Sequence, residues 1–202
     1  MTLEELRRRF AAAAPPAESF YGDEGARPEA AVLRPASVLV PIVDRSKETP
    51  AGLTVLLTRR AAHLKDHSGQ VSFPGGRVAP GDPSPEATAL REAREEIGLD
   101  PGRVEVLGRM PEYLTRTGFR ITPVVGVVTP PIELQRDANE VDEIFEVPLA
   151  FLLDPANHQR QSREWQGGLR WFYAMDYGPH TIWGATAGMV VNLYRFLSQG
   201  RL

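Results

Sequence analysis

The segment PSPEATALREAREEIGL, residues 83–99, constrains the fold more than any other stretch of this chain. Ser84 is suited to cap a helix, Pro85 to occupy its first turn, and Gly98 to end it. Apolar side chains recur at helical spacing and form one arc that can face a core: Leu90, Ala93 and Ile97. Because β-rich runs lie on both sides of this helix along the chain, the sequence predicts a mixed α/β layer fold.

The predicted strands and helices cover most of the chain. Strands are expected at 36–44 and 52–60 as a hairpin, and at 103–113 and 118–128. VSFPGG, residues 71–76, predicts a short strand that runs into a glycine turn, while a late hairpin is expected over 159–177 and a closing helix over 184–198. Residues 1–35 are expected to be an N-terminal helix, ended by Pro15-Pro16, and a surface loop of the same unit. Residues 36–202 are expected to form a single domain.

Composition excludes several classes of protein. The net charge of the 202 residues is −3 with no stripe of basic side chains, so no nucleic-acid partner is expected. The chain has no cysteine, which excludes disulfides, zinc–thiolate sites, iron–sulfur clusters and a thiol nucleophile. No apolar run approaches the ~18 residues of a membrane span, and the N-terminus lacks the long apolar run of a signal peptide. We therefore expect a cytoplasmic protein without a membrane partner, and the sequence does not predict its oligomeric state.

Three glutamates lie close together on the predicted helix. Glu92, Glu95 and Glu96 fall within an arc of ~100°, where like charges destabilise a helix by a few tenths of a kcal/mol. The arc is either a solvated surface or a binding site for a hard cation such as Mg²⁺ or Mn²⁺, which prefers oxygen ligands. Gly75 and Gly76 precede the helix; they form either an ordinary turn or a place where the backbone approaches a phosphate.

Other common catalytic motifs are missing. The chain has no phosphate-binding P-loop, no dinucleotide-binding glycine motif and no nucleophile elbow. His63 and His67 have the spacing of a zinc-protease helix, but Leu64 stands where that motif requires glutamate. The glutamate arc is therefore the main candidate site.

The segment GGRVAPGDPSPEATALREAREEIGL, residues 75–99, resembles the Nudix box, whose signature is G-x5-E-x7-R-E-U-x-E-E-x-G-U with U a bulky aliphatic residue. Residues 91–99 match it with one weak position, because Ala93 is small for U. In the first half, Asp82 stands where glutamate is expected, and eight residues instead of seven separate it from Arg91. The resemblance leaves the role of Asp82 open.

Two further segments resemble the coenzyme A pyrophosphatase branch of the Nudix hydrolases, which also carries the longer box. One is LLTRRAAHLKDHSGQVSFPGG, residues 56–76, and the other is TIWGATA, residues 181–187. Where that branch has an arginine this chain has Lys65, which keeps the charge but loses the bidentate fork.

The resemblance implies a Nudix fold, a mixed β-sheet sandwiched between α-helices, and a metal-dependent enzyme that cleaves coenzyme A or its derivatives to 3′,5′-ADP and 4′-phosphopantetheine. It implies Mg²⁺ or Mn²⁺ on Glu92 and Glu96 with Glu95 assisting, and Arg91 as structural support for these carboxylates. The expected substrate-binding residues are Arg60, Lys65, Gly75 and Gly76. The general base is left open among Glu95, Glu140 and Glu143.

Two other functions stay open at this point. One is a Nudix hydrolase of another substrate, such as ADP-ribose, a dinucleoside polyphosphate or a nucleoside triphosphate. The other is a non-catalytic nucleotide-binding module, against which the intact REAREE run argues, because a sensor needs no complete metal face.

Overall fold

The computed structural model of the protein describes residues 1–12, 20–21, 32–165 and 168–198. Its centre is a large mixed sheet in which β8 (Phe119–Val128), β2 (Arg34–Asp44) and β3 (Leu53–Arg60) lie side by side. β2 pairs with β8 in parallel over residues 34–43 and with β3 in the antiparallel sense at its end. The predicted hairpin of the first two strands is thus confirmed.

The remaining strands of the large sheet extend or edge this centre. β9 (Val141–Pro148) and β4 (Val71–Ser72) pair with β3, while β5 (Gly75–Arg77) pairs with β2. β6 (Val104–Arg109) and β7 (Tyr113–Leu114) pair with β8, and β1 (Phe20–Tyr21) pairs with β7. A smaller antiparallel sheet contains β10 (Gln159–Trp165), β11 (Gly168–Tyr177) and β12 (His180–Trp183). β10 and β11 confirm the late hairpin.

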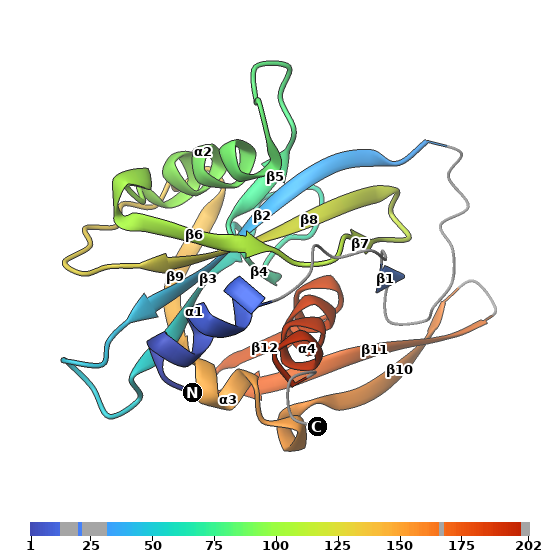
Figure 1. The fold of residues 1–202 in the computed structure, drawn as a ribbon. Coiled ribbons are helices and arrows are strands. Elements are labelled where there is room, and N and C mark those ends of the chain that lie inside the picture. Colours follow the sequence, from blue (N-terminus) through green and yellow to red (C-terminus); the bar gives the residue numbers. More distant parts are fainter. Residues whose placement is uncertain (13–19, 22–31, 166–167, 199–202) are drawn as a thin grey trace.

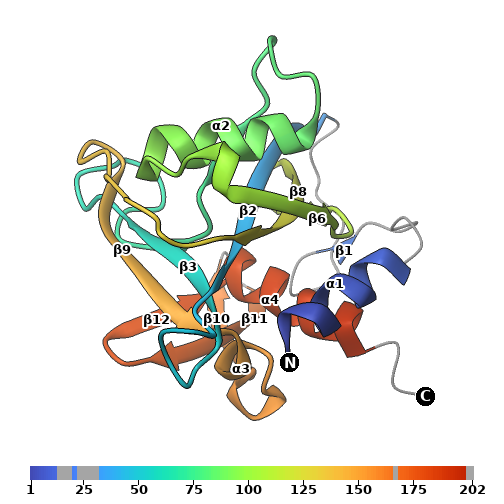
Figure 2. The same ribbon diagram turned by 60° about the vertical axis from the view of Figure 1, so that its left-hand side comes forward.

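Helices cover both faces of the large sheet (Figures 1 and 2). α2 (Pro85–Ile97) covers one face, and α1 (Leu3–Ala12), α4 (Ala185–Ser198) and the small sheet lie on the other. The short α3 (Leu149–Leu152) and a 3₁₀ turn at Pro155–Asn157 connect β9 to β10, and a second 3₁₀ turn at Pro101–Arg103 connects α2 to β6. This is the predicted α/β arrangement of a mixed sheet between helices.

Two apolar clusters hold the layers together, one on each face of the sheet. Side chains alternate along β2, so that Leu39 and Val43 face α2 whereas Val40 and Ile42 face the opposite side. Ala93 and Ile97 of α2 are fully buried in the first cluster, which lies between α2 and the sheet, as their helical spacing predicts. The second cluster lies on the opposite face of the sheet and contains side chains from α1, α4 and the small sheet.

The N-terminal helix packs on the same core as the strands, because Leu6 and Phe10 are buried in the second cluster. The assignment of residues 1–35 to the same unit as residues 36–202 stays a prediction. The predicted stop at Pro15-Pro16 and most of the predicted loop lie outside the described residues. None of the helices in the described ranges is both long and apolar enough to cross a bilayer.

Two local predictions are wrong. The glycine pair 75–76 is not a turn, because both residues belong to β5 and pair with Val38 and Ser37 of β2. The expected strand 103–113 is also broken: β6 ends at Arg109, and β7 begins only at Tyr113. Pro111 lies in the interruption, where its missing backbone N–H cannot donate to a ladder.

Candidate active site

α2 is fixed at both ends by the residues that its sequence predicts. The Ser84 hydroxyl accepts a hydrogen bond from the Ala87 backbone N–H at 3.2 Å, and Gly98 adopts the left-handed conformation that ends the helix, with φ of 68°. The buried Ser37 hydroxyl of β2 donates to the Pro85 carbonyl at 2.7 Å. The start of the helix is therefore anchored to the sheet, which fixes the direction of its polar face.

Glu96 is the most buried carboxylate on that face, with 4% of its surface exposed. Its Oε2 accepts a hydrogen bond from the Gly75 backbone N–H at 3.1 Å, and its Oε1 lies 3.9 Å from Nη1 of Arg60. The pKa of Glu96 is raised to about 8, chiefly by burial, and the charges of Glu140 and Glu92 act in the same direction. A carboxylate with so few protein partners is costly to ionise unless a cation approaches it.

Glu92 lies beside Glu96, one helical turn earlier. Burial raises the pKa of Glu92, and the nearby charges of Glu95 and Glu140 act in the same direction. The carboxylate packs directly on Gly76, where an added Cβ atom would lie only 2.5 Å from its Cδ. The Glu92 carboxylate therefore leaves no room for a side chain at residue 76.

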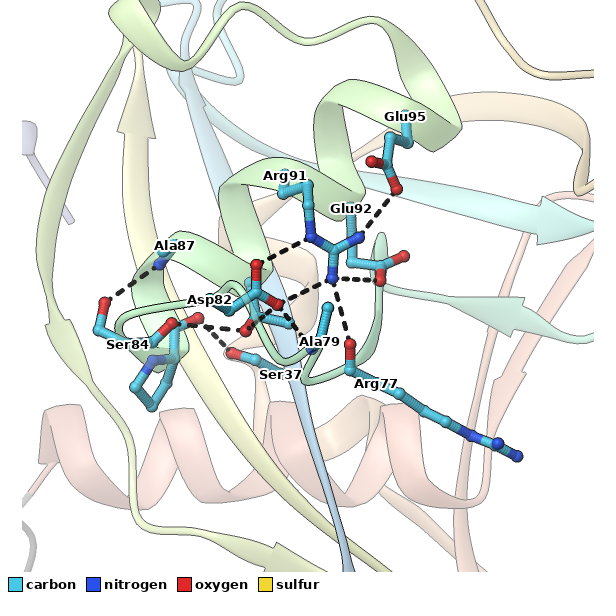
Figure 3. Close-up of polar contacts among 11 residues, drawn as sticks. Ser37, Arg77, Ala79, Asp82, Ser84, Ala87, Arg91, Glu92 and Glu95 are labelled. Atoms are coloured by element: carbon cyan, nitrogen blue, oxygen red, sulfur yellow. Dashed lines mark hydrogen bonds and ion pairs between the residues drawn. The ribbon is translucent and has the colours of Figure 1, made fainter.

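Arg91 connects the loop before α2 to the glutamates (Figure 3). Its guanidinium donates to Asp82 through Nε at 3.0 Å and Nη2 at 2.9 Å, and Nη2 also lies 2.8 Å from Oε1 of Glu92. Nη1 donates to Glu95 at 2.9 Å. Asp82 also accepts from the Ala79 backbone N–H, and its pKa is held well below its usual range chiefly by the Arg91 hydrogen bonds.

The structure separates Glu95 from the other two glutamates. The Glu95 side chain is 60% exposed and points toward Arg91 (Figure 3), whereas Glu92 and Glu96 are turned toward β5. The three carboxylates therefore do not form one equivalent face, although their helical positions alone predict it. Arg91, four residues before Glu95, draws that carboxylate outward.

The two expected substrate cations also differ in position. Arg60, at the end of β3, lies at Glu96, and its Nε atom is buried without a hydrogen-bond partner among the described residues. Lys65 is exposed in the loop between β3 and β4. Within the described ranges, Lys65 forms no ion pair with Glu92 or Glu96, which pair with Arg91 and Arg60. Only Arg60 is brought to the carboxylates.

The two distal glutamates lie in different surroundings. The charge of Glu140 raises the pKa of both Glu92 and Glu96, and its carbonyl accepts a hydrogen bond from Ala61, the residue after Arg60. The Glu143 carboxylate instead lies 3.4 Å from Nη2 of Arg59 and 3.4 Å from Nε2 of His180. Glu140 is thus close to the helix glutamates, whereas Glu143 belongs to a separate group of side chains.

The donor atoms fit a hard divalent cation. Glu92 and Glu96 offer carboxylate oxygens, the donor type that Mg²⁺ and Mn²⁺ prefer, and the buried Glu96 has only one close hydrogen bond. Within the described ranges, no three acidic or histidine side chains converge closely enough to enclose a metal ion on their own. Substrate oxygens and water would complete the coordination, as they commonly do around Mg²⁺.

Sequence reasoning missed part of the support for this site. It left the role of Asp82 open, yet Asp82 fixes Arg91 through two hydrogen bonds and also accepts from the Thr88 hydroxyl at 2.9 Å. It did not single out Ser37 or the Arg77 carbonyl, which accepts from Arg91 at 3.2 Å. The role of Asp82 could have been predicted, because an acidic residue that precedes a helix by a short loop can pair with an arginine such as Arg91 on that helix. A backbone carbonyl leaves no trace in the sequence.

Comparison with known proteins identifies the family. The NUDIX domain model matches residues 33–186. The chain is 41% identical over 165 residues to the uncharacterized Nudix hydrolase NudL of Enterobacter sp. (strain 638), which covers 79% of this chain and 81% of that protein. The protein of the same name from Escherichia coli (strain K12) is 41% identical over 160 residues, with the same coverage.

A solved structure shows the same fold. The MutT protein from Methanosarcina mazei Go1 aligns over 95% of this chain and 100% of its own, with a TM-score of 0.51 and 17% identity. The match to the family model and the 41% identity to the NudL proteins show that the chain belongs to the Nudix family of hydrolases. It is an enzyme of the pyrophosphatase type, and enzymes of this family generally need divalent metal ions.

Proposed function

We propose that the protein hydrolyses the diphosphate of coenzyme A or a derivative to 3′,5′-ADP and 4′-phosphopantetheine. One observation carries the proposal: contacts join the box to segment 56–76 and segment 56–76 to segment 181–187, the two segments that resemble the coenzyme A branch. Arg60 of segment 56–76 lies 3.9 Å from Glu96 of the box, and the buried Thr186 hydroxyl of segment 181–187 donates to the Val71 carbonyl of segment 56–76 at 3.0 Å. Segment 56–76 thus contacts both the box and segment 181–187, although segment 181–187 lies far away in the sequence.

In this proposal the chain holds and orients the reactants. Mg²⁺ or Mn²⁺ would be held by Glu92 and Glu96, and would supply positive charge to the diphosphate and acidify a water. Arg91 and Asp82 fix the Glu92 carboxylate, and Glu95, held by Arg91, assists from the exposed side. Water adds across the P–O–P linkage, so that each product keeps one of the two phosphates.

We assign the proton from that water to Glu140 in preference to Glu143 and Glu95. Glu140 lies near enough to Glu92 and Glu96 for its charge to raise the pKa of both. Glu143 pairs with Arg59 and His180, and Glu95 pairs with Arg91. A base must reach the attacking water, so the glutamate that shares the carboxylate site is the best placed.

Arg60 is the proposed contact for a substrate phosphate. Its buried Nε lacks a partner in the described structure, and an arginine is suited to bind phosphate through two parallel hydrogen bonds. Lys65 is proposed as a second, exposed cation, while Gly75 and Gly76 keep the backbone close to the site. The expected cytoplasmic location and the absence of nucleic-acid partners stay predictions.

The substrate is tested with the purified protein, Mg²⁺ or Mn²⁺, and a panel of diphosphates whose products are identified by mass. We expect kcat/KM for coenzyme A to exceed that for dephospho-coenzyme A and ADP-ribose by roughly ten- to a hundredfold, from charge-assisted contacts to the 3′-phosphate. R60A should reduce this preference strongly, and K65A should reduce it less. The neighbouring R59A is the matched control, because Arg59 pairs with Glu143 instead of Glu96.

Other outcomes would redirect the proposal. Faster hydrolysis of ADP-ribose or of a dinucleoside polyphosphate would leave a Nudix hydrolase with a different substrate. Binding of nucleotides without turnover of any would indicate a non-catalytic module. An unchanged preference in R60A would remove Arg60 from substrate recognition.

The carboxylates are tested by conversion to amides. E92Q and E96Q should each lower kcat by about 10²–10⁴-fold, because they remove groups that act in the transition state, and a chelator should abolish activity. E140Q should lower kcat and alter the acid limb of the pH profile with metal affinity kept, whereas E143Q should change both less. Near-normal turnover by folded E92Q or E96Q would contradict the assignment, and a larger effect of E143Q than of E140Q would reverse the choice of base.

A further inference from the structure

The outer strand of the small sheet, β10, has an unusual environment. Figure 1 shows β10 beside β11 at the edge of this sheet. The side chains from Gln159 to Glu164 are all exposed, on both faces of the strand. Among the described strands, β10 pairs only with β11, so the backbone groups along its other edge have no strand partner there. Such an edge is a template for pairing with another chain.

The sequence of β10 is complementary to itself in one antiparallel register. If two copies pair about a twofold axis through Ser162, Arg160 of each copy lies opposite Glu164 of the other. The pair occurs twice by symmetry, and the polar Gln161 lies opposite Arg163. Opposite charges directly across an antiparallel pair are stabilising, whereas like charges are destabilising.

Neighbouring registers lack this complementarity. Moving the axis by one residue toward the N-terminus places Arg160 opposite Ser162 of the other copy, so that neither ion pair forms. Moving it by one residue toward the C-terminus places Arg163 opposite itself. Of these three registers, only the one centred on Ser162 forms both ion pairs, and it places no arginine opposite another.

Exposed apolar side chains lie on the face that carries the charged pair. Leu169 and Trp171 of β11 are 56% and 40% exposed, and their cross-strand partners are Glu164 and Ser162. The Arg160 guanidinium lies 4.9 Å from the centre of the Trp171 ring. Pairing of two β10 strands would place these apolar side chains from both copies on one continuous face, which gives association an apolar component.

We propose that β10 is a homodimer interface, through which two copies of this chain join their small sheets edge to edge with Ser162 on the axis. The interface is built from one strand and a few apolar side chains, so it belongs at the small end of specific interfaces. Association should therefore depend on concentration. The proposal rests on the edge strand alone and is independent of the substrate.

The test is sedimentation of the full chain over about 1–100 µM. The apparent mass of the wild type should rise from 22.3 kDa toward twice that value. R160E and E164R should each weaken association by about tenfold or more, because each creates two like-charge contacts in this register. An equimolar mixture of the two variants should associate again, since both opposing pairs then have opposite charges, and the R160E/E164R double variant should do so alone. R163Q, on the same strand but outside the ion pair, is the control.

The outcomes separate this interface from its alternatives. A wild type that stays monomeric at all concentrations overturns the proposal. Protection of the β10 amides from hydrogen exchange in such a monomer would show that another part of the same chain covers the edge. A dimer that R160E and E164R leave intact would place the interface elsewhere. Unchanged thermal unfolding of the monomeric variants would show that they remain folded, as the exposure of both side chains predicts.

Discussion

At the scale of single residues, the contact between Gly76 and Glu92 gives the sharpest prediction. A Cβ atom at Gly76 would lie 2.5 Å from the Glu92 carboxylate, so G76A must displace that side chain. A displacement of about 1 Å at a catalytic group can reduce activity by ~10²-fold, and we expect a loss of that order in kcat. G81A is the matched control, because nothing lies within 4 Å of a Cβ added there. Equal activity in the two variants would contradict a role for the Glu92 position.

Residue scale is also where sequence reasoning has its clearest limit. Helical spacing predicted which residues lie near the polar face of α2, and it predicted the burial of Ala93 and Ile97. It could not separate Glu95 from Glu96, because that difference arises from contacts with Arg91 on one side and Gly75 on the other. Spacing along a helix fixes angles, whereas the partner that each carboxylate finds depends on the tertiary structure.

At the scale of elements, an ion pair joins the first turn of α2 to β6. Arg109 donates to Glu86 at 2.5 and 2.7 Å, and these hydrogen bonds lower the pKa of Glu86 from 4.5 to about 2. Because the pKa is lower in the folded state, the pair stabilises the fold above pH 4.5, and this contribution disappears as the pH falls toward 2. Arg109 is 44% exposed, so screening limits the gain to on the order of 1 kcal/mol.

E86Q should therefore lower the free energy of unfolding at neutral pH, and the difference from wild type should shrink between pH 4.5 and 2. Denaturant unfolding at a series of pH values measures it. E105Q is a suitable control, because the Glu105–Arg7 pair joins α1 to β6 with both side chains more exposed. A difference that persists undiminished in acid would show that Glu86 acts through something other than its charge.

The elements themselves were predicted where local rules are strong. Residues adjacent in sequence predicted the caps of α2, the β2–β3 and β10–β11 hairpins and the closing helix. The glycine pair in β5 was misassigned because glycines are common in turns, whereas here they allow close approach to β2. At Gly75, with φ of 159°, an added Cβ would lie 2.5 Å from the Ser37 carbonyl oxygen. Such a packing reason cannot be read from a single segment.

At the scale of the whole molecule, one buried hydrogen bond links the last helix to the large sheet. Thr186 of α4 is 6% exposed and donates to the Val71 carbonyl of β4. T186V keeps the side-chain shape but removes this donor, so we expect the free energy of unfolding to fall by about 0.5–1.5 kcal/mol. Chemical denaturation measures the change, and T117V, at an exposed threonine on a turn, is the control. Equal stability of the two variants would show that the link between the layers does not depend on this bond.

The parallel pairing of β2 with β8 has a consequence for how the chain folds. The strand at residues 34–44 leaves the ribosome early, but the strand that borders it over ten residues begins only at Phe119. Parallel neighbours require a long connection, which here includes α2, and closing it costs chain entropy before the contacts form. Contacts of such large sequence separation slow folding. During synthesis, the edge of β2 that pairs with β8 therefore has no partner strand until residues 119–128 have been made.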